Sequence, residues 1–301
     1  MQKLRSRITR NSRTTLALML SLLITAIGCH QTDNDVAEEP QIPSGELWKI
    51  VEDAYTFTFP LVMMGATMQA STNTEVAITT QAPVNQIFHA KRLARAESKL
   101  IVTPNVDTLY SQAFFDLSKD ALVFRKPAVG RYCSVQLLDQ YTNCIATLGT
   151  GSDTQDERLY LFSGPGFSGD APEWLTRVNF PTNNAWMLIR TIVEDDEDLE
   201  NVYAIQAEMK LVPLAAYLIN EFDYDPPKGE YKAENDFVPI QHVLAMPPME
   251  YFSFANELMA INPPAPEDSA MLERIAKIGV GPPSTLMRPY WATIQSRSGK
   301  L

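Results

Sequence analysis

The chain has 301 residues, of which 45% are hydrophobic and 20% charged, with a formal net charge of -11 at pH 7. This length predicts one large domain or two modest ones, and the composition excludes wholesale disorder. The acidic balance excludes a nucleic-acid binder, because neutralising phosphates requires a basic face. With three histidines and no HExxH string, the sequence predicts no metal centre, and no motif indicates a cofactor.

The N-terminal 28 residues have the pattern of a leader. Five basic side chains and no acid precede an apolar run over residues 14–28, which ends at Cys29. The run is shorter than the roughly 20 residues of a membrane-spanning helix, so it predicts a signal-peptide core. A basic start, an apolar core and small residues before a cysteine resemble a bacterial lipoprotein signal, in which that cysteine is diacylated and becomes the mature N-terminus. A cleaved secretory signal and an uncleaved anchor are the alternatives.

A lipid on Cys29 would be the membrane attachment of this protein. Without residues 1–28 the chain has 20 basic and 36 acidic residues, so anionic head groups would repel it. Gln31, where an Asp would direct the protein to the inner membrane, favours the periplasmic face of the outer membrane over the inner membrane. Secretion is the other, less favoured location. Residues 29–44 are polar, acidic and proline-containing, which predicts a flexible tether.

The body begins with a predicted helix and continues with strands. An apolar stripe from Leu47 to Tyr55 predicts a helix that starts at Gly45 and is interrupted at Pro60. From about residue 100 the sequence alternates in short runs over residues 106–116, 131–138, 144–148 and 158–163. Several short strands punctuated by Gly and Pro predict an antiparallel β-sandwich. Its expected core contains Leu109, Phe115, Val135 and Leu137.

The second half has a helical pattern. The acidic run 195–198 suits a helix N-terminus, since carboxylates there are stabilised by the helix dipole, and it lacks the spacing of a calcium loop. Two further helices are predicted over residues 249–261 and 269–278, the second closed by Gly279.

Cysteine and histidine leave few options for covalent chemistry. Cys133 and Cys144 either form a disulfide or remain two buried free thiols, because sequence does not fix strand register. A Ser-His-Asp triad would have to use His89 or His242, and neither lies near a candidate nucleophile in the sequence.

A set of polar and aromatic residues forms the candidate site. Strand alternation places Tyr110 opposite Leu109, and Gln136 opposite Val135, so one sandwich surface could collect hydroxyls, amides and a carboxylate. In the alternative interpretation Asn105 and Asp107 cap a turn, and the tyrosine hydroxyls bond backbone at sheet corners. The candidates are Asn105, Asp107, Thr108, Tyr110, Gln136, Asp139, Tyr141, Asn143 and Arg190.

These residues lie within strings that resemble a known bacterial family. TPNVDTLYSQAFFDLS, GRYCSVQLLDQYTNCIATLGT, LFSGPGF and AWMLIRTIVEDDEDLENVYAIQ occur in the order found in DUF1254, a family of unknown function. The resemblance covers residues 45–280. It implies an α+β protein with an immunoglobulin-like antiparallel β-sandwich, then a small helical region, and usually a C-terminal jelly-roll partner called DUF1214. It implies no established activity.

Five segments follow from these observations. Residues 1–28 are the predicted signal peptide, 29–44 the tether, 45–194 the DUF1254-like sandwich with its N-terminal helix, 195–281 the helical region and 282–301 an irregular basic tail. The tail has three basic residues and no acid, and it resembles nothing in the family. It either folds back on the acidic body or marks a truncation that replaced the DUF1214 partner. A truncation would expose Phe252 and Leu258.

Three functions are compatible with the sequence. The first is a lipid-anchored periplasmic binding or interaction module, whose small-molecule or protein partner is unknown. The second is an enzyme that uses Asp107 or Asp139 as acid or base beside Tyr110, Tyr141 and Arg190, because enclosure by aromatic side chains raises a carboxyl pKa. The third is a remnant whose function requires a missing domain.

Overall fold

The computed structural model describes residues 42–95, 105–149, 156–282 and Trp291. Two units are distinguished, Met1–Ser44 and Gly45–Leu301, and the account below concerns the second. The predicted leader, Cys29 and most of the predicted tether lie outside the described residues. No helix within the described ranges is both long and apolar enough to cross a membrane.

The first helix, α2 (Ser44–Ser71), continues through Pro60, so the predicted interruption at this residue is wrong. Proline removes one backbone donor and usually kinks a helix interior. Here the turns on both sides of Pro60 are fixed by burial. Ile50 and Ala54 before it, and Leu61 and Val62 after it, have no exposed surface. Tertiary packing of this face therefore outweighs the local cost of the proline.

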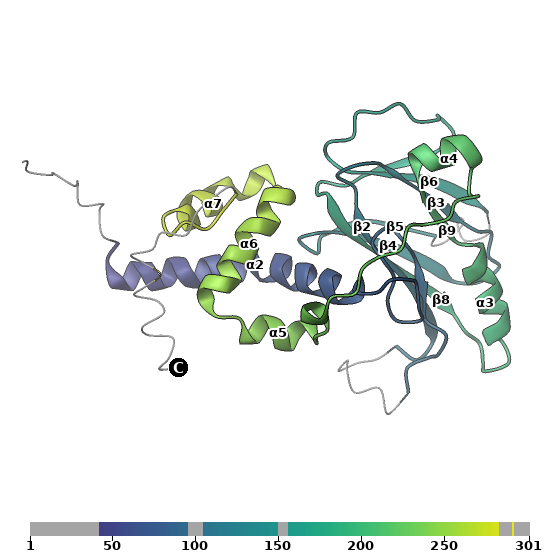
Figure 1. Cartoon of the computed structure of the whole chain (residues 1–301), viewed down its shortest axis with the longest axis horizontal. Coiled ribbons are helices and arrows are strands. Elements are labelled where there is room, and N and C mark those ends of the chain that lie inside the picture. The colour runs from purple at the N-terminus through teal and green to yellow at the C-terminus, as the bar shows by residue number, and fades with distance from the viewer. Residues whose placement is uncertain (1–41, 96–104, 150–155, 283–290, 292–301) are drawn as a thin grey trace, which may run out of the picture. The chain divides into compact units, whose positions relative to one another are not determined.

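Two sheets form the β part of the molecule (Figure 1). Strand β8 (Asn184–Ile192) is the central strand of the five-stranded sheet, and β3 (Leu122–Lys126) is internal to the four-stranded sheet. The first sheet has the order β1 (Phe88–His89), β2 (Thr108–Asp116), β8, β4 (Cys133–Asp139) and β5 (Cys144–Leu148). The second has the order β7 (Thr176–Asn179), β6 (Arg158–Ser163), β3 and β9 (Lys210–Pro213).

Among the described strands, pairing is antiparallel in every pair but one. Strands β6 and β7 are parallel, which corrects the expectation of a purely antiparallel sandwich. The segment between Ser163 and Thr176 explains the exception, because a parallel pair needs a crossover of about a dozen residues rather than a tight hairpin. The mixture of helices and sheets confirms the α+β class. The immunoglobulin-like type of the sandwich stays a prediction.

The two sheets share one core. Phe115, Val135 and Leu137 of the five-stranded sheet pack in the same cluster as Phe124 and Phe162 of the four-stranded sheet. These three predicted core residues are confirmed, with no exposed surface. Leu109 is buried too, but it belongs to a separate cluster with Val193 and Val202, at the end of the sandwich covered by α3 (Leu199–Glu208).

The segment after residue 194 combines helices with one strand of the sandwich. Helix α3 is followed by β9, which pairs with β3. Asn262, which directly follows helix α6 (Pro248–Ile261), accepts a hydrogen bond from the Asn184 backbone N–H at 2.7 Å and thereby ties this helix to β8. The further helices are α4 (Leu214–Asn220), α5 (Pro239–Ala245), α6 (Pro248–Ile261) and α7 (Ser269–Ala276).

Phe252 and Leu258 on α6 are buried, so the exposure expected from a truncation is not observed. The ring of Trp291 lies 4.8 Å from that of Phe252, and its indole N–H donates to the Ile278 carbonyl at 2.9 Å. Leu258 packs against α2, where a Cβ added to Gly65 would stand 2.6 Å from its side chain. Apart from Pro282 and Trp291, the predicted basic tail lies outside the described residues.

Candidate functional site

The predicted site residues fall into three groups along the five-stranded sheet. At the first, the Asn105 side-chain oxygen accepts the backbone N–H of Asp107 at 2.8 Å and that of Thr108 at 3.1 Å. Asp107 is exposed, and its carbonyl accepts the N–H of Val193 just beyond β8. Thr108 is buried, and its hydroxyl has no hydrogen-bond partner among the described residues. Asn105 thus organises the turn that leads into β2.

The second group forms the turn between β4 and β5. One carboxylate oxygen of Asp139 accepts the backbone N–H groups of Tyr141 and Asn143 at 2.8 and 2.9 Å, and the other accepts the Asn143 side-chain amide at 3.0 Å. The Tyr141 hydroxyl donates to the Asn262 carbonyl at 2.9 Å. Burial, with the charges of Asp268 and Asp139, raises the pKa of Tyr141. Asp139 and Tyr141 therefore fix a turn and its contact with α6.

The third group lies on the face of the sheet that points away from the shared core. The Arg190 guanidinium is 5.3 Å from the Tyr110 ring centroid, and its Nε donates to the Tyr110 hydroxyl at 3.3 Å. A second nitrogen donates to the Gln136 side-chain oxygen at 3.0 Å. Tyr110, Gln136 and Arg190 are therefore brought together, each from a different strand.

The two candidate carboxylates lie at opposite ends of this sheet. The Asp107 carbonyl accepts the N–H of Val193, just beyond the end of β8, and Asp139 lies opposite Ala185 of β8. Val193 and Ala185 are eight positions apart along the chain. At about 3.3 Å per residue this separation is about 26 Å. Asp107 and Asp139 are thus not brought together with each other in one site.

A cleft not predicted from the sequence lies where the edge strands β1 and β9 of the two sheets come closest to each other. Its volume is about 250 Å³, enough for about eight water molecules at liquid density. His89 of β1 and Lys210 of β9 provide its charged and titratable groups, and the segment after α4 covers it. The lining residues are Ala77, Gln86, Ile87, His89, Met209, Lys210, Leu211, Val212, Phe222, Tyr224 and Pro226.

His89 is held by Ser111, its register partner on β2. The imidazole Nδ1 lies 2.7 Å from the Ser111 Oγ. Which of the two atoms donates the hydrogen bond depends on the tautomer of His89. Burial, together with the charges of Lys91 and Lys210, lowers the pKa of His89 to about 4. The imidazole is therefore neutral at pH 7, with one nitrogen committed to Ser111 and Nε2 left for a ligand.

Lys91 and Lys210 differ in how they are compensated. Lys91 donates to the Gln206 side-chain oxygen at 2.9 Å and lies 4.4 Å from the centroid of the Tyr203 ring. Burial lowers its pKa, against an opposing effect of Glu200. Lys210 is exposed, and within the described part of the chain it has no ion pair. The cleft thus has an uncompensated positive charge at its rim.

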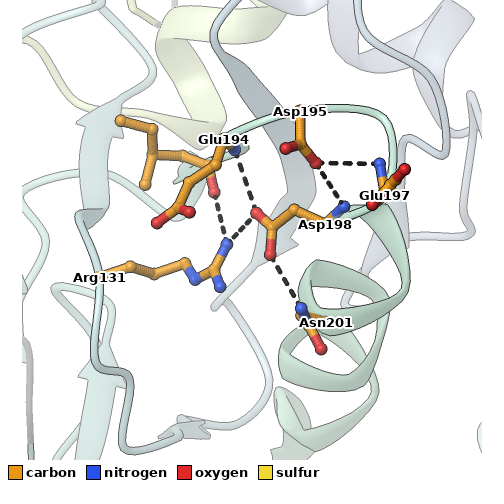
Figure 2. A network of polar contacts seen from close by, with 7 residues as sticks. Arg131, Glu194, Asp195, Glu197, Asp198 and Asn201 are labelled. Atoms are coloured by element: carbon orange, nitrogen blue, oxygen red, sulfur yellow. Dashed lines mark hydrogen bonds and ion pairs between the residues drawn. The ribbon is translucent and has the colours of Figure 1, made fainter.

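A second polar network surrounds the acidic run that precedes α3 (Figure 2). Asp195 accepts the backbone N–H groups of Glu197 and Asp198, both at 3.0 Å. Asp198 pairs with Arg131 and accepts the Glu194 backbone N–H at 3.1 Å and the Asn201 side-chain amide at 3.0 Å. The hydrogen bond from Arg131 is the largest cause that holds the Asp198 pKa well below its usual range.

The carboxylate of Asp198 is fully hydrogen-bonded in this network. Both carboxylate oxygens of Asp198 accept hydrogen bonds, and Arg131 also donates to the Ile192 carbonyl at 3.3 Å. The acidic run does precede a helix, as predicted, but its side chains bind the preceding turn and a neighbouring loop instead of capping α3.

The two cysteines of the body are both free thiols, but the expectation that both are buried is wrong for Cys144. Cys133 is buried and Cys144 is exposed. Burial is the main cause that raises the pKa of Cys133.

Across the described ranges, no three His, Cys, Asp or Glu side chains lie close enough together to hold a metal ion.

A family model described as "Protein of unknown function (DUF1254)" matches residues 84–213. This range runs from just before β1 to the end of β9, so it contains both strands that border the cleft. The match supports the DUF1254 family for this part of the chain. No curated protein sequence matches.

Among solved structures, the chain is similar to the VPA0106 protein from Vibrio parahaemolyticus, with 16% sequence identity and a TM-score of 0.61. That similarity covers 85% of this chain and 57% of the other, so this chain corresponds to little more than half of VPA0106. An uncharacterized protein from Burkholderia cenocepacia matches at 12% identity and a TM-score of 0.29, over 71% of this chain and 53% of that one. The first similarity supports the α+β fold, and the second is too weak to support a conclusion about the fold.

Proposed function

We propose that this protein is a lipid-anchored periplasmic binding module of the DUF1254 type, held on the outer membrane through Cys29. The cleft between β1 and β9 is its ligand site. The leader-like pattern of residues 1–28 supports the anchor and the location. The cleft supports the binding function, because small-molecule sites are concave and combine apolar surface with placed polar groups.

The lining of the cleft combines apolar and polar groups in similar shares. Ile87, Met209 and Leu211 give an apolar wall, while His89, Gln86 and Lys210 supply polar groups. The volume, about 250 Å³, lies just below the range of about 300–1,000 Å³ typical of ligand pockets, so the ligand is a small metabolite.

The burial of Ser111 favours binding over hydrolysis. A serine nucleophile paired with histidine needs a substrate carbonyl within about 3 Å of its oxygen. Ser111 has no exposed surface, so a substrate in the cleft would meet His89 before it could meet the serine hydroxyl. In this arrangement Ser111 orients the imidazole, and His89 contacts the ligand.

The binding function is tested by blocking the cleft. Ala77 is exposed and lines the cleft, so Ala77→Trp should fold normally and fill its mouth. Small molecules released from the full chain, purified from its own host, are compared by mass spectrometry with those released from Ala77→Trp. The matched control is Ala270→Trp, at an exposed position on α7. A compound retained by the wild type and the control but absent from Ala77→Trp supports the proposal, and identical profiles contradict it.

The anchor is tested at Cys29. Intact-mass measurement of the membrane fraction should show a diacylated chain that begins at this residue. Cys29→Ser should release the protein from the membrane fraction. Attachment that is unchanged by this substitution would show that the lipid proposal is wrong.

A further inference from the structure

We infer that the ligand of the β1–β9 cleft is a small monocarboxylate with an apolar body; this inference rests on the proposed function. The positive charges at the cleft, the lack of acids in its lining and the apolar wall each support it.

The charges at the cleft have the opposite sign to the protein as a whole. The chain has 36 acidic and 25 basic residues, yet Lys210 lines the cleft and Lys91 lies close to His89. Both lysine charges act on the same imidazole, so their fields overlap there. An anion placed beside Nε2 of His89 would be attracted by both ammonium groups and could accept a hydrogen bond from Nε2 in the tautomer that carries a proton there.

The nearby acids are directed elsewhere. The described residues that line the cleft include no aspartate or glutamate. Glu208, two residues before Lys210, has a carboxylate oxygen 3.3 Å from Arg125. Asp223 and Asp225 alternate with the lining residues Phe222 and Tyr224 and are not part of the lining. No carboxylate of the lining therefore neutralises Lys210, whereas Glu200 acts on Lys91 outside the lining.

The apolar wall limits the kind of anion. Ile87, Met209, Leu211 and Phe222 offer surface to a hydrocarbon chain or a ring, which inorganic phosphate lacks. Because burying apolar surface is favourable, a short-chain or aromatic acid gains affinity that a bare ion does not. A carboxylate also presents two oxygens, one for Lys210 and one for His89.

Histidine NMR gives a direct test, because the chain has only three histidines. The full chain, ¹⁵N-labelled at histidine and held in neutral detergent micelles at pH 7.5, is titrated with butyrate, with butyramide and with inorganic phosphate. The His89 signals are assigned by their loss in His89→Gln. We expect butyrate to shift them saturably, and butyramide and phosphate to require at least about tenfold higher concentrations, the effect of losing one charge-assisted hydrogen bond or the apolar contact.

Two matched variants locate the charge. Lys210→Gln should weaken butyrate binding about tenfold. Lys119→Gln, at an exposed lysine beside β3, should leave it unchanged. Ala77→Trp should abolish the butyrate response.

Several results would overturn the inference. Equal binding of butyramide would show that charge is not recognised, and equal binding of phosphate would show that the apolar body is not. A butyrate response that survives in Ala77→Trp would place the anion outside the cleft, and no response to butyrate would also refute the inference. The proposed function fails separately, when compounds co-purified from the host are unaffected by Ala77→Trp.

Discussion

Two polar regions of the sandwich contain basic side chains. In one region the basic side chain is paired with an acid, and in the other it is not. Around α3, Arg131 is paired with Asp198, and the acid is further bonded to backbone and amide donors. In the β1–β9 cleft, Lys210 lies near a neutral His89, with no carboxylate in the lining, while Lys91, outside the lining, is compensated by its neighbours. A compensated charge holds elements together, whereas uncompensated charges at a cleft provide free energy that a ligand can use.

The largest expected effect concerns the compensated region. Asp198→Ala leaves the poorly exposed Arg131 without its acid and removes the acceptor of the Glu194 N–H, so it should lower the free energy of unfolding by about 2–3 kcal/mol. Urea denaturation at pH 7 measures this. The control is Glu157→Ala, which breaks a more exposed pair with Arg125 and should cost less than about 1 kcal/mol. Equal costs for the two variants would remove the contrast on which the comparison rests.

Much of the sandwich was predictable from the sequence, but its central strand was not. Short alternating runs predicted β2 and β4, whose core-facing residues are the more buried ones. The runs of β5 and β6 were predicted as further strands next to Gly and Pro turns. Strand β8 escaped detection because both of its faces are covered over much of its length. Met187 and Ile189 enter the shared core, while the Trp186 ring stacks on that of Phe114 at 5.4 Å on the other face. Such a strand has no clear two-residue period.

The candidate site was less predictable, because its contacts depend on which residues of neighbouring strands lie opposite each other. Sequence alternation placed Tyr110 and Gln136 on one face, and the missing strand β8 is the element that carries Arg190 between them. His89 and Ser111 are 22 positions apart and become neighbours only through the pairing of β1 with β2. Their contact depends on which residues of two strands lie opposite each other, and a short strand such as β1 gives little local indication of that register.

The second effect is a dependence of stability on pH that originates in the cleft. The pKa of His89 is about 4 in the folded protein and about 6.5 in the unfolded chain, so the unfolded state binds more protons between these values. The stabilisation is complete above pH 6.5 and is lost as the pH falls toward 4. Between pH 7 and pH 4.5 we expect His89 to account for about 1–3 kcal/mol of the loss in unfolding free energy.

Urea denaturation at both pH values checks this expectation. His89→Gln should lose less stability on acidification than the wild type, while His242→Gln, which changes a histidine outside the cleft, should behave like the wild type. If His89→Gln is as acid-sensitive as the wild type, the imidazole is not kept neutral by its surroundings.

The third effect concerns the positioning of the imidazole. Ser111→Ala removes one hydrogen bond in a buried setting and should lower the unfolding free energy by about 1 kcal/mol. It should also change the ¹⁵N shifts of His89, because the serine selects which ring nitrogen carries the proton. Ser134→Ala, at a buried serine on β4, is the control that should leave these shifts unaltered. Unchanged His89 shifts in Ser111→Ala would mean that Ser111 does not orient the ring.

The smallest effect tests whether the charge in the cleft is uncompensated. Lys210 is exposed, so Lys210→Gln should change the unfolding free energy by less than about 0.5 kcal/mol. The substitution should nevertheless raise the pKa of His89, because the positive charge of Lys210 is one of the causes that lower it. Added salt should shift the wild-type pKa in the same direction, since screening weakens the repulsion between Lys210 and the imidazolium. Lys119→Gln should alter neither quantity. An NMR titration of His89 that gives the same pKa with and without Lys210 would show that this lysine is already neutralised. The contrast between the two regions would then fail, because Lys91 is compensated by Gln206, Tyr203 and Glu200.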